Sequence, residues 1–278
     1  MSKKPIFSVE VFPPKIEYGI ERIYGCLEGL SKTNPAFISV TYSAGNATDG
    51  LTAEVCGYIK NKYNLKAVSH LTCTGATKAK ILSVLDKLKE NGVTEILALR
   101  GDITPEKPLL EYQYATELME TINEYGGFEL SASCYPEGHV ESKDRYDDII
   151  VMKKKYDLGV RHYLSQLFFD NLDFMYMVEE ARKLGVKDAC IEAGIMPVTR
   201  AGQIKRMVEL SGAKLTDNIV NAIEKYGNNK DDMYKAGIEM AIEQIRDLID
   251  KGVDGIHLYT MDDEVLSQKI YEGIKDLL

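Results

Sequence analysis

The sequence predicts an α/β fold, a (β/α)8 TIM barrel, and three observations support this prediction. Eight short apolar runs recur along the 278 residues, and almost every run ends in polar or titratable side chains. The first seven runs begin 26 to 33 residues apart, which leaves room for one strand and one helix in each unit. Helical patterns fill the gaps between the runs. Strand followed by helix, repeated eight times, is typical of a closed parallel barrel, whose catalytic residues lie at the C-terminal ends of the strands.

The eight apolar runs are the predicted strands. They cover residues 6–12, 37–42, 67–72, 96–102, 129–135, 162–168, 188–196 and 255–260. In the first run, Phe7, Val9 and Val11 alternate toward the covering helices. Ser8 and Glu10 therefore face the barrel interior. Two consecutive prolines then end this strand.

Apolar residues at helical spacing mark the first, third and fifth covering helices. They are Ile20, Ile23, Leu27 and Leu30 in the first, Ile81, Leu82, Leu85 and Leu88 in the third, and Tyr146, Ile149, Ile150 and Tyr156 on one face of the fifth. We expect Asn91 and Gly92 to end the third helix in a left-handed cap, and Gly159 to end the fifth.

The seventh interval is about twice as long as the others, with 67 residues between the starts of its two strands. Helical patterns cover residues 203–210, 215–226 and 233–250, with a polar turn at 227–230. The sequence therefore predicts an elaborated seventh β/α segment on the catalytic face. Since no linker-like stretch interrupts the chain, we expect residues 1–278 to form a single domain.

Composition and charge narrow the class of protein. With 45% hydrophobic and 28% charged residues, the chain can form an ample core and a hydrated surface. A net charge of −9 without a basic stripe argues against a nucleic-acid partner. Five scattered cysteines, the absence of a signal-type segment and the absence of a run long enough to cross a bilayer predict a cytoplasmic protein that does not enter membranes.

Titratable and polar residues at the strand ends are the candidates for function. They are Glu10, Thr41, His70, Arg100, Asp102, Tyr135, His139 and Gln166. Burial of Glu10 in the barrel should raise its pKa, so that its carboxyl can donate a proton near neutral pH. The alternative interpretation is a structural ion pair between Glu10 and Arg100. Gly101, between Arg100 and Asp102, would let the backbone approach a flat or phosphorylated ligand closely.

Two further readings of the residues stay open. The lysine run at 153–155 is either a solvated helix end or a contact for an anionic ligand. His70, His139, Glu10 and Asp102 could bind a divalent metal in a barrel hydrolase, although no strand carries a His-x-His pair. His162 begins a predicted strand, so we expect it at the opposite, stability-related end.

Taken in order, the strand-end motifs resemble those of the methylenetetrahydrofolate reductases, bacterial type and catalytic domain only. The motifs are residues 9–14 (VEVFPP), 39–42 (SVTY), 70–73 (HLTC), 98–102 (ALRGD), 135–139 (YPEGH), 165–170 (SQLFFD), 194–198 (GIMPV) and 257–260 (HLYT). Most are weak alone, but eight in register cover essentially the whole chain. The resemblance implies reduction of 5,10-methylenetetrahydrofolate to 5-methyltetrahydrofolate by NADH or NADPH, with FAD as the hydride carrier.

The resemblance also implies roles for individual residues. Glu10 would be the general acid that protonates the folate ring nitrogen, and Asp102 would lie beside the flavin and stabilise the resulting cation. Positions that match cofactor contacts are Thr41, Tyr42, Ala44, His70, Arg100, Gly101, Asp102, Tyr135, His139, Asp148 and Lys155. Positions that match substrate contacts are Glu10, Thr41, Gln166, Gln203 and Met207. Arg100 and Lys155 would face the diphosphate.

The chain departs from the family pattern at two positions. Met207 stands where bacterial relatives carry a phenylalanine that stacks on the substrate, and Asp263 stands where relatives often carry an arginine for the folate tail. Asp263 can alternatively cap the last helix. The eukaryotic regulatory domain, and inhibition by S-adenosylmethionine, are not expected. We expect a homo-oligomer, and the runner-up function is a flavoprotein subunit that receives electrons from a redox partner.

Overall fold

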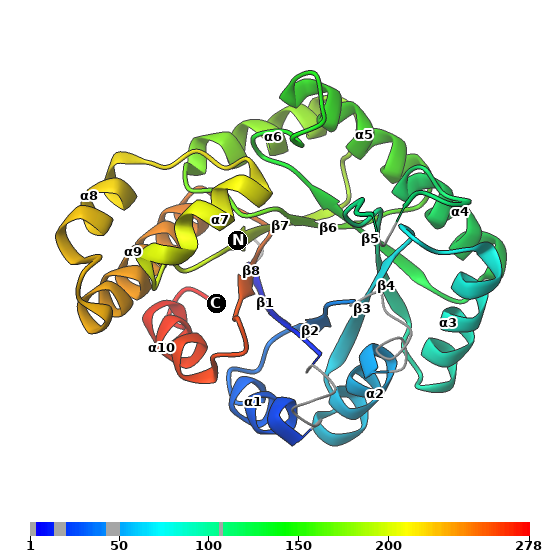
Figure 1. Cartoon of the computed structure of the whole chain (residues 1–278), viewed down its shortest axis with the longest axis horizontal. Coiled ribbons are helices and arrows are strands. Elements are labelled where there is room, and N and C mark those ends of the chain that lie inside the picture. The colour runs from blue at the N-terminus through cyan, green and yellow to red at the C-terminus, as the bar shows by residue number, and fades with distance from the viewer. Residues whose placement is uncertain (1–3, 14–20, 43–50, 106–107) are drawn as a thin grey trace.

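The computed structural model describes residues 4–13, 21–42, 51–105 and 108–278. Its eight parallel strands form a closed barrel in sequence order, and the last strand pairs with the first (Figure 1). Helices surround the barrel on the outside (Figure 1). The predicted (β/α)8 fold is confirmed.

All eight predicted strands are present. They are β1 (Ile6–Val11), β2 (Phe37–Val40), β3 (Lys66–Thr72), β4 (Glu95–Leu99), β5 (Glu129–Cys134), β6 (His162–Ser165), β7 (Cys190–Ile195) and β8 (Gly255–Tyr259). Two strands are about three residues shorter at their C-terminal ends than the apolar runs suggested, because β4 ends before Arg100 and β6 ends before Gln166. Arg100 and Gln166 therefore lie beyond the strands, at the mouth of the barrel, which is the C-terminal end of its strands.

The helices follow the predicted order. They are α1 (Glu21–Ser31), α2 (Leu51–Tyr63), α3 (Lys78–Glu90), α4 (Ala115–Tyr125), α5 (Arg145–Asp157), α6 (Asn171–Lys183), α7 (Ala201–Ser211), α8 (Asp217–Tyr226), α9 (Lys230–Asp250) and α10 (Glu264–Ile274). Between β7 and β8, α7, α8 and α9 form the predicted elaborated segment. Gly92, with a φ of 70°, follows α3 as expected, while Ile20, expected in the first helix, falls outside the described residues. Within the described ranges, every helix is too short or too polar to span a bilayer.

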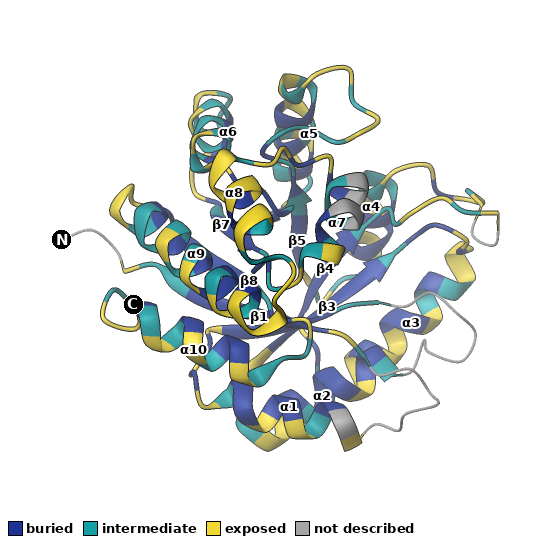
Figure 2. Cartoon of the chain, turned by 60° about the vertical axis from the view of Figure 1, so that its left-hand side comes forward, coloured by how far each residue is buried: buried dark blue, intermediate teal, exposed yellow. Residues whose placement is uncertain are grey.

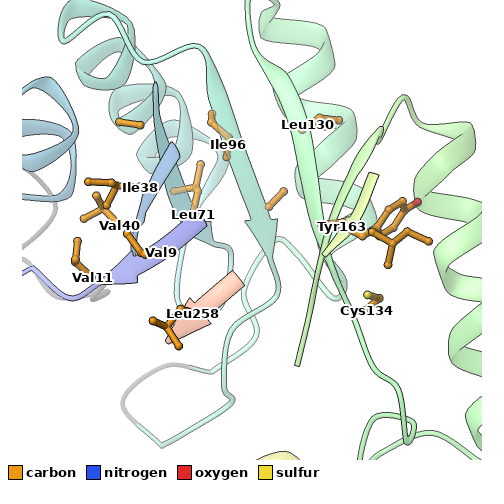
Figure 3. Close-up of a cluster of buried hydrophobic side chains, with 14 of the residues drawn as sticks. Val9, Val11, Ile38, Val40, Leu71, Ile96, Leu130, Cys134, Tyr163 and Leu258 are labelled. Atoms are coloured by element: carbon orange, nitrogen blue, oxygen red, sulfur yellow. The ribbon is translucent and has the colours of Figure 1, made fainter. Parts of the chain in front are cut away.

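The main hydrophobic core lies between the outer face of the strands and the helices. Val9, Ile38, Leu71 and Ile96 project outward from four neighbouring strands, and Tyr163 does so from β6 (Figure 3). The helices are buried along the side that meets the barrel and exposed along the other (Figure 2). The alternation read in β1 is thus confirmed: its odd-numbered residues pack outward.

The predicted inner face of α5 is wrong in part. Tyr146 and Ile150 are exposed, whereas Asp148 and Lys155 are buried beside Ile149. The helix turns two polar residues toward the barrel mouth and leaves two apolar ones in solvent. Reading apolar residues as the buried face fails where a helix contributes polar groups to a site.

The barrel interior is unusually polar. An apolar layer of Phe37, Val68, Leu97 and Leu164 lies inside, but buried polar and charged side chains pack above and below it. These are Ser8, Glu10, Ser39, His70, Glu95, Ser131, Glu192 and His257. Hydrogen bonds connect them across the interior, for example from the Ser8 hydroxyl to Oε2 of Glu192 (2.5 Å).

The floor of the barrel, at the N-terminal ends of the strands, holds a charged network. The imidazole of His162 lies between Glu95 and Glu192, and Lys66 pairs with Glu95. Although burial opposes each charge, hydrogen bonds with Cys190, Glu192 and Glu95 raise the pKa of His162 to about 12. Burial also opposes the charge of Glu95, but contacts with His162 and Lys66 lower its pKa to about 2. The expected place of His162 away from the mouth is confirmed.

Candidate active site

The structure places the predicted site residues around one mouth of the barrel. Glu10 lies at the end of β1 and His70 on β3. Thr41 and Tyr42 follow β2, the segment 100–102 follows β4, Tyr135 and His139 follow β5, and Gln166 follows β6. Asp148 and Lys155 lie on α5, and Gln203 and Met207 on α7. Ala44 falls outside the described residues.

Glu10 is held inside the mouth with little access to water. It is 7% exposed, and its backbone carbonyl accepts a 2.6 Å hydrogen bond from the hydroxyl of Thr260. Its Oε2 lies 3.5 Å from Nε2 of His70 and 3.8 Å from Nε2 of His257. Burial raises the pKa of Glu10.

The two histidines beside Glu10 are neutral near pH 7. Burial lowers the pKa of His70 and of His257 to about 4 in each case. Their contacts with Glu10 are therefore not ion pairs. A carboxyl between two neutral imidazoles keeps its proton more readily than a carboxyl in water does, which is the property a general acid needs.

The alternative ion pair between Glu10 and Arg100 is not formed. The guanidinium of Arg100 makes a bidentate pair with Glu141, at 2.6 Å from Nη1 to Oε2 and 2.8 Å from Nη2 to Oε1. Glu141 belongs to the loop before α5, and its side chain is 55% exposed. Arg100 therefore points to the rim of the mouth rather than into the barrel, where an anionic ligand can replace Glu141.

Gly101 allows the chain to turn sharply beside Arg100. Its φ is 86°, and a Cβ at this position would collide with the hydroxyl oxygen of Thr74. Glycine is thus required by both backbone conformation and space. Asp102, the next residue, is exposed at the mouth.

The loop after β5 is fixed to α5. The backbone N–H of His139 donates to Oδ2 of Asp148 at 2.5 Å. The ring of Tyr135 meets the ring of His139 edge to face, with centroids 5.0 Å apart. Asp148 thus has a visible structural role, because it sets the position of a loop that carries two candidate residues.

Lys155 is buried, unlike the solvated helix end that was one reading of the lysine run. Its Nζ donates a 2.8 Å hydrogen bond to the carbonyl of Ser133. Burial lowers the pKa of Lys155 to about 8, although Cys134 and Asp148 favour its charge. Lys153, by contrast, pairs with Asp157 at the surface.

A second hydrophobic cluster forms the other side of the mouth. It joins Leu167 and Phe169, which follow β6, to the elaborated segment, and Met207 packs against it. Gln166 accepts a 2.9 Å hydrogen bond at Oε1 from the N–H of Leu167, which orients its amide. Gln203 is half-buried on the same helix as Met207.

Comparison with known proteins identifies the family. A family model described as methylenetetrahydrofolate reductase matches residues 1–275. The chain belongs to the methylenetetrahydrofolate reductase family. The predicted resemblance is confirmed.

Relatives agree with this assignment, and a solved structure shares the fold. The chain is 30% identical over 265 residues to the 5,10-methylenetetrahydrofolate reductase of Pectobacterium carotovorum subsp. carotovorum, covering 95% of this chain and 88% of that protein. It is 31% identical to the probable methylenetetrahydrofolate reductase (NADPH) of Caenorhabditis elegans, covering 98% of this chain and 42% of that protein. A Clostridium thermocellum protein described as binding two copies of 5-methyl-5,6,7,8-tetrahydrofolic acid shares the fold, with a TM-score of 0.68, 12% identity, and coverage of 99% of this chain and 96% of that chain.

Family membership argues against the alternative hypothesis of a metal-dependent hydrolase. Among the residues that the structure describes, one group of three potential metal ligands has all its ligand atoms within 4.8 Å of one another. It consists of His162, Cys190 and Glu192. These three lie at the floor. His70 and His139, which the metal-hydrolase reading needs, do not belong to such a group.

Sequence reasoning gave no role to His257, Tyr259 or Glu141. His257 is fully buried beside Glu10, and the hydroxyl of Tyr259 donates to the carbonyl of Ser165 at 2.6 Å. Both could have been found, because alternation along β8 turns them into the barrel together with Gly255. Nothing in the sequence pairs Glu141 with Arg100, since 41 residues separate them.

Proposed function

We propose that this protein reduces 5,10-methylenetetrahydrofolate to 5-methyltetrahydrofolate at the mouth of its barrel, with NADH or NADPH as reductant and Glu10 as the general acid. Family membership supports the reaction class. The observation that supports the role of Glu10 is its buried carboxyl at the end of β1, with its pKa raised by burial between two neutral histidines.

The residues at the mouth fit an FAD molecule. Nε2 of His70 is buried 3.5 Å from Oε2 of Glu10 and makes no hydrogen bond in the described structure, so a ligand group that reaches this point could satisfy it. Gly101 lets the chain turn sharply against Thr74, which places Arg100 and Asp102 on either side of this turn at the mouth. Arg100 at the rim and Lys155 beneath it would supply two cations for a diphosphate. A bound FAD would take hydride from the nicotinamide and deliver it to the folate.

Further contacts of the cofactor are proposed for the remaining residues that match the family pattern. These are Thr41, Tyr42, Ala44, Asp102, Tyr135, His139 and Asp148. Asp148 would act through its hydrogen bond to the His139 backbone. Asp102, exposed at the mouth, would place a carboxylate where positive charge develops on the substrate.

Glu10 would perform the proton step of folate reduction. Its carboxyl would give a proton to the ring nitrogen of the folate, so that the five-membered ring opens to an iminium cation. The carboxylate that remains is buried near His70 and His257, which would favour recovery of a proton once the product leaves. Thr260 fixes the backbone of Glu10, and thus the height of its carboxyl in the barrel.

The substrate would lie between this acid and the second hydrophobic cluster. Thr41 and Gln166 would contact the nicotinamide or the folate ring, and Gln203 the folate. Met207 would fill the space in which relatives carry a stacking phenylalanine. Since Met is flexible, we expect it to orient the substrate less strictly than an aromatic ring does.

An anaerobic experiment on the isolated 278-residue chain tests this proposal. NADH or NADPH should bleach the flavin absorbance, and methylenetetrahydrofolate should restore it. In Glu10→Gln the first step should persist, whereas the second should slow by about 10²–10⁴-fold, as is typical for loss of a general acid. Glu179→Gln, a surface change on α6 that removes one of the contacts of Lys183, is the matched control and should behave as wild type.

The outcomes separate the competing readings. A Glu10→Gln protein that reduces folate at the wild-type rate would refute the assignment of the acid. An isolated chain whose flavin is not reduced by either nicotinamide would instead favour the flavoprotein subunit fed by a redox partner. We also propose that the protein forms a homo-oligomer, which light scattering on the purified chain would test by measuring its mass. We propose a cytoplasmic location, which cell fractionation would test.

A further inference from the structure

The barrel floor brings together three side chains with metal-binding atoms. His162 is the first residue of β6, Cys190 is the first residue of β7, and these two residues are register partners. Glu192 lies two residues further along β7, so its side chain is on the same face as Cys190. The imidazole nitrogen, the thiol sulfur and the carboxylate oxygen all lie within 4.8 Å of one another.

The surroundings hold two of these groups in fixed orientations. Nδ1 of His162 lies 2.9 Å from Oε1 of Glu95, while Nε2 faces Oε1 of Glu192. The second oxygen of Glu192 accepts the hydroxyl of Ser8 at 2.5 Å. A histidine whose one nitrogen donates to a carboxylate while the other faces further ligands is the usual arrangement around protein-bound zinc.

The lack of a side chain at Gly255 leaves room for the side chain of Glu192 at the floor. Gly255, at the start of β8, faces the same side, and a Cβ on it would lie 2.8 Å from Cγ of Glu192. Glu95 is not an available ligand, because its other oxygen pairs with Lys66. The group thus consists of three potential ligands and two orienting residues, Glu95 and Ser8.

We propose that the floor of the barrel binds one divalent ion of the zinc class through Nε2 of His162, the Cys190 sulfur and the Glu192 carboxylate. Nitrogen, sulfur and oxygen donors together favour zinc or cobalt over calcium and magnesium. Cys190 is partly exposed, which gives the ion a path from solvent and gives a water molecule the fourth position. This site lies at the opposite end of the barrel from Glu10 and does not depend on the proposed reaction.

Binding of the ion requires donor atoms that carry no proton, so Nε2 of His162 and the Cys190 sulfur must both be deprotonated in the bound state. The proton on Nδ1 can stay in its hydrogen bond with Glu95. Any proton that leaves the donor atoms as the ion enters passes to solvent.

One contact must open for the ion to enter. The hydrogen bond between Nε2 of His162 and Glu192 is shorter than the separation of about 3.3–3.6 Å expected between ligand atoms around tetrahedral zinc. Rotation of the Glu192 carboxylate about its Ser8 contact can provide this opening. The proton between Nε2 of His162 and the Glu192 carboxylate and the metal ion therefore compete for the same position.

Cobalt titration of the chain, after treatment with a chelator, tests the proposal. Co²⁺ should bind with a stoichiometry of one, with a near-ultraviolet thiolate-to-cobalt band and visible bands of tetrahedral intensity. Zn²⁺ should displace it. Cys190→Ala should abolish the thiolate band, while Cys56→Ala, a buried thiol on α2, should leave it intact.

A second variant separates binding from folding. Ser8→Ala leaves the three ligand residues in place but removes the hydroxyl that orients the Glu192 carboxylate. It should weaken Co²⁺ binding by about 10–100-fold. Absence of stoichiometric binding in wild type, or a thiolate band that survives in Cys190→Ala, would overturn the proposal. In that case His162 retains its proton and the floor is a charge network only. Folate reduction is assayed separately, so failure of either proposal leaves the other testable.

Discussion

At the scale of single residues, burial acts in opposite directions on the two most informative side chains. Loss of water raises the pKa of the acid Glu10 and lowers that of the base Lys155, the latter to about 8. Both shifts favour the neutral form and bring titration closer to physiological pH. The chemistry assigned to each residue should therefore depend on pH in a predictable direction.

Lys155 should make FAD retention sensitive to pH. Below about pH 8 the ammonium is charged and attracts the diphosphate; above it, the free protein loses this charge. We expect the dissociation constant of FAD, measured by flavin fluorescence, to rise as the pH increases past this value. The change in FAD binding free energy across this pH range should be roughly 1.5–3 kcal/mol, the contribution of one hydrogen bond to a charged group. We call this change the pH step.

Two variants show whether that step belongs to Lys155. Lys155→Gln should bind FAD weakly, with no such step, whereas Lys153→Gln should retain the wild-type profile because Lys153 pairs with Asp157 at the surface. If Lys155→Gln keeps the step, another group controls retention.

At the scale of elements, the turn after β4 depends on the absence of a side chain at Gly101. Gly101→Ala should lower both stability and FAD retention, because it adds left-handed strain of about 1–2 kcal/mol and a collision with Thr74. Gly252, after α9, has a similar φ of 81°, but no atom of the described residues lies within 4 Å of the position that a Cβ would take there. Gly252→Ala should therefore show the strain alone in urea unfolding and leave FAD retention unchanged. If both variants lost stability and FAD retention equally, the collision with Thr74 would not explain the glycine at position 101.

The last helix is capped by the residue that departs from the family pattern. Oδ1 of Asp263 accepts a 2.9 Å hydrogen bond from the N–H of Leu266, as expected of a helix N-cap. Asp263→Arg removes this cap and should cost about 0.5–2 kcal/mol of unfolding free energy, whereas Asp263→Asn should be close to neutral. Urea midpoints measure both. A fall in the folate KM of Asp263→Arg, without loss of stability, would instead show that the position serves only the substrate tail.

At the scale of the whole molecule, the barrel is closed where β1 meets β8. Gly255 lies at this seam, and a Cβ there would be 2.5 Å from Cγ1 of Ile6. Gly255→Ala should destabilise the protein by about 1–3 kcal/mol through overpacking. Gly25→Ala lies in α1, where no atom of the described residues is within 4 Å of the position of a Cβ, and it should stabilise the protein by about 0.5–1 kcal/mol. Thermal unfolding compares the two, and a stable Gly255→Ala protein would show that the seam can relax.

The sequence predicted the barrel well because its strands are apolar runs and its outer face is uniformly hydrophobic. It predicted the Glu10 environment in outline, since alternation along β1 alone turns this carboxyl inward. It did not predict the burial of Asp148 and Lys155, because a polar inner face contradicts the usual helix pattern. The Arg100–Glu141 pair also escaped prediction, because it depends on how two loops approach each other.

The pairing of β1 with β8 has a consequence for synthesis of the chain. During synthesis, Glu10 is made about 250 residues before its neighbour His257 and the hydroxyl of Thr260. Until then β1 lacks one of its two neighbouring strands, and Glu10 is open to water on that side. We therefore expect Glu10 to lack its buried surroundings, and the raised pKa that burial gives it, until β8 has been made and has paired with β1.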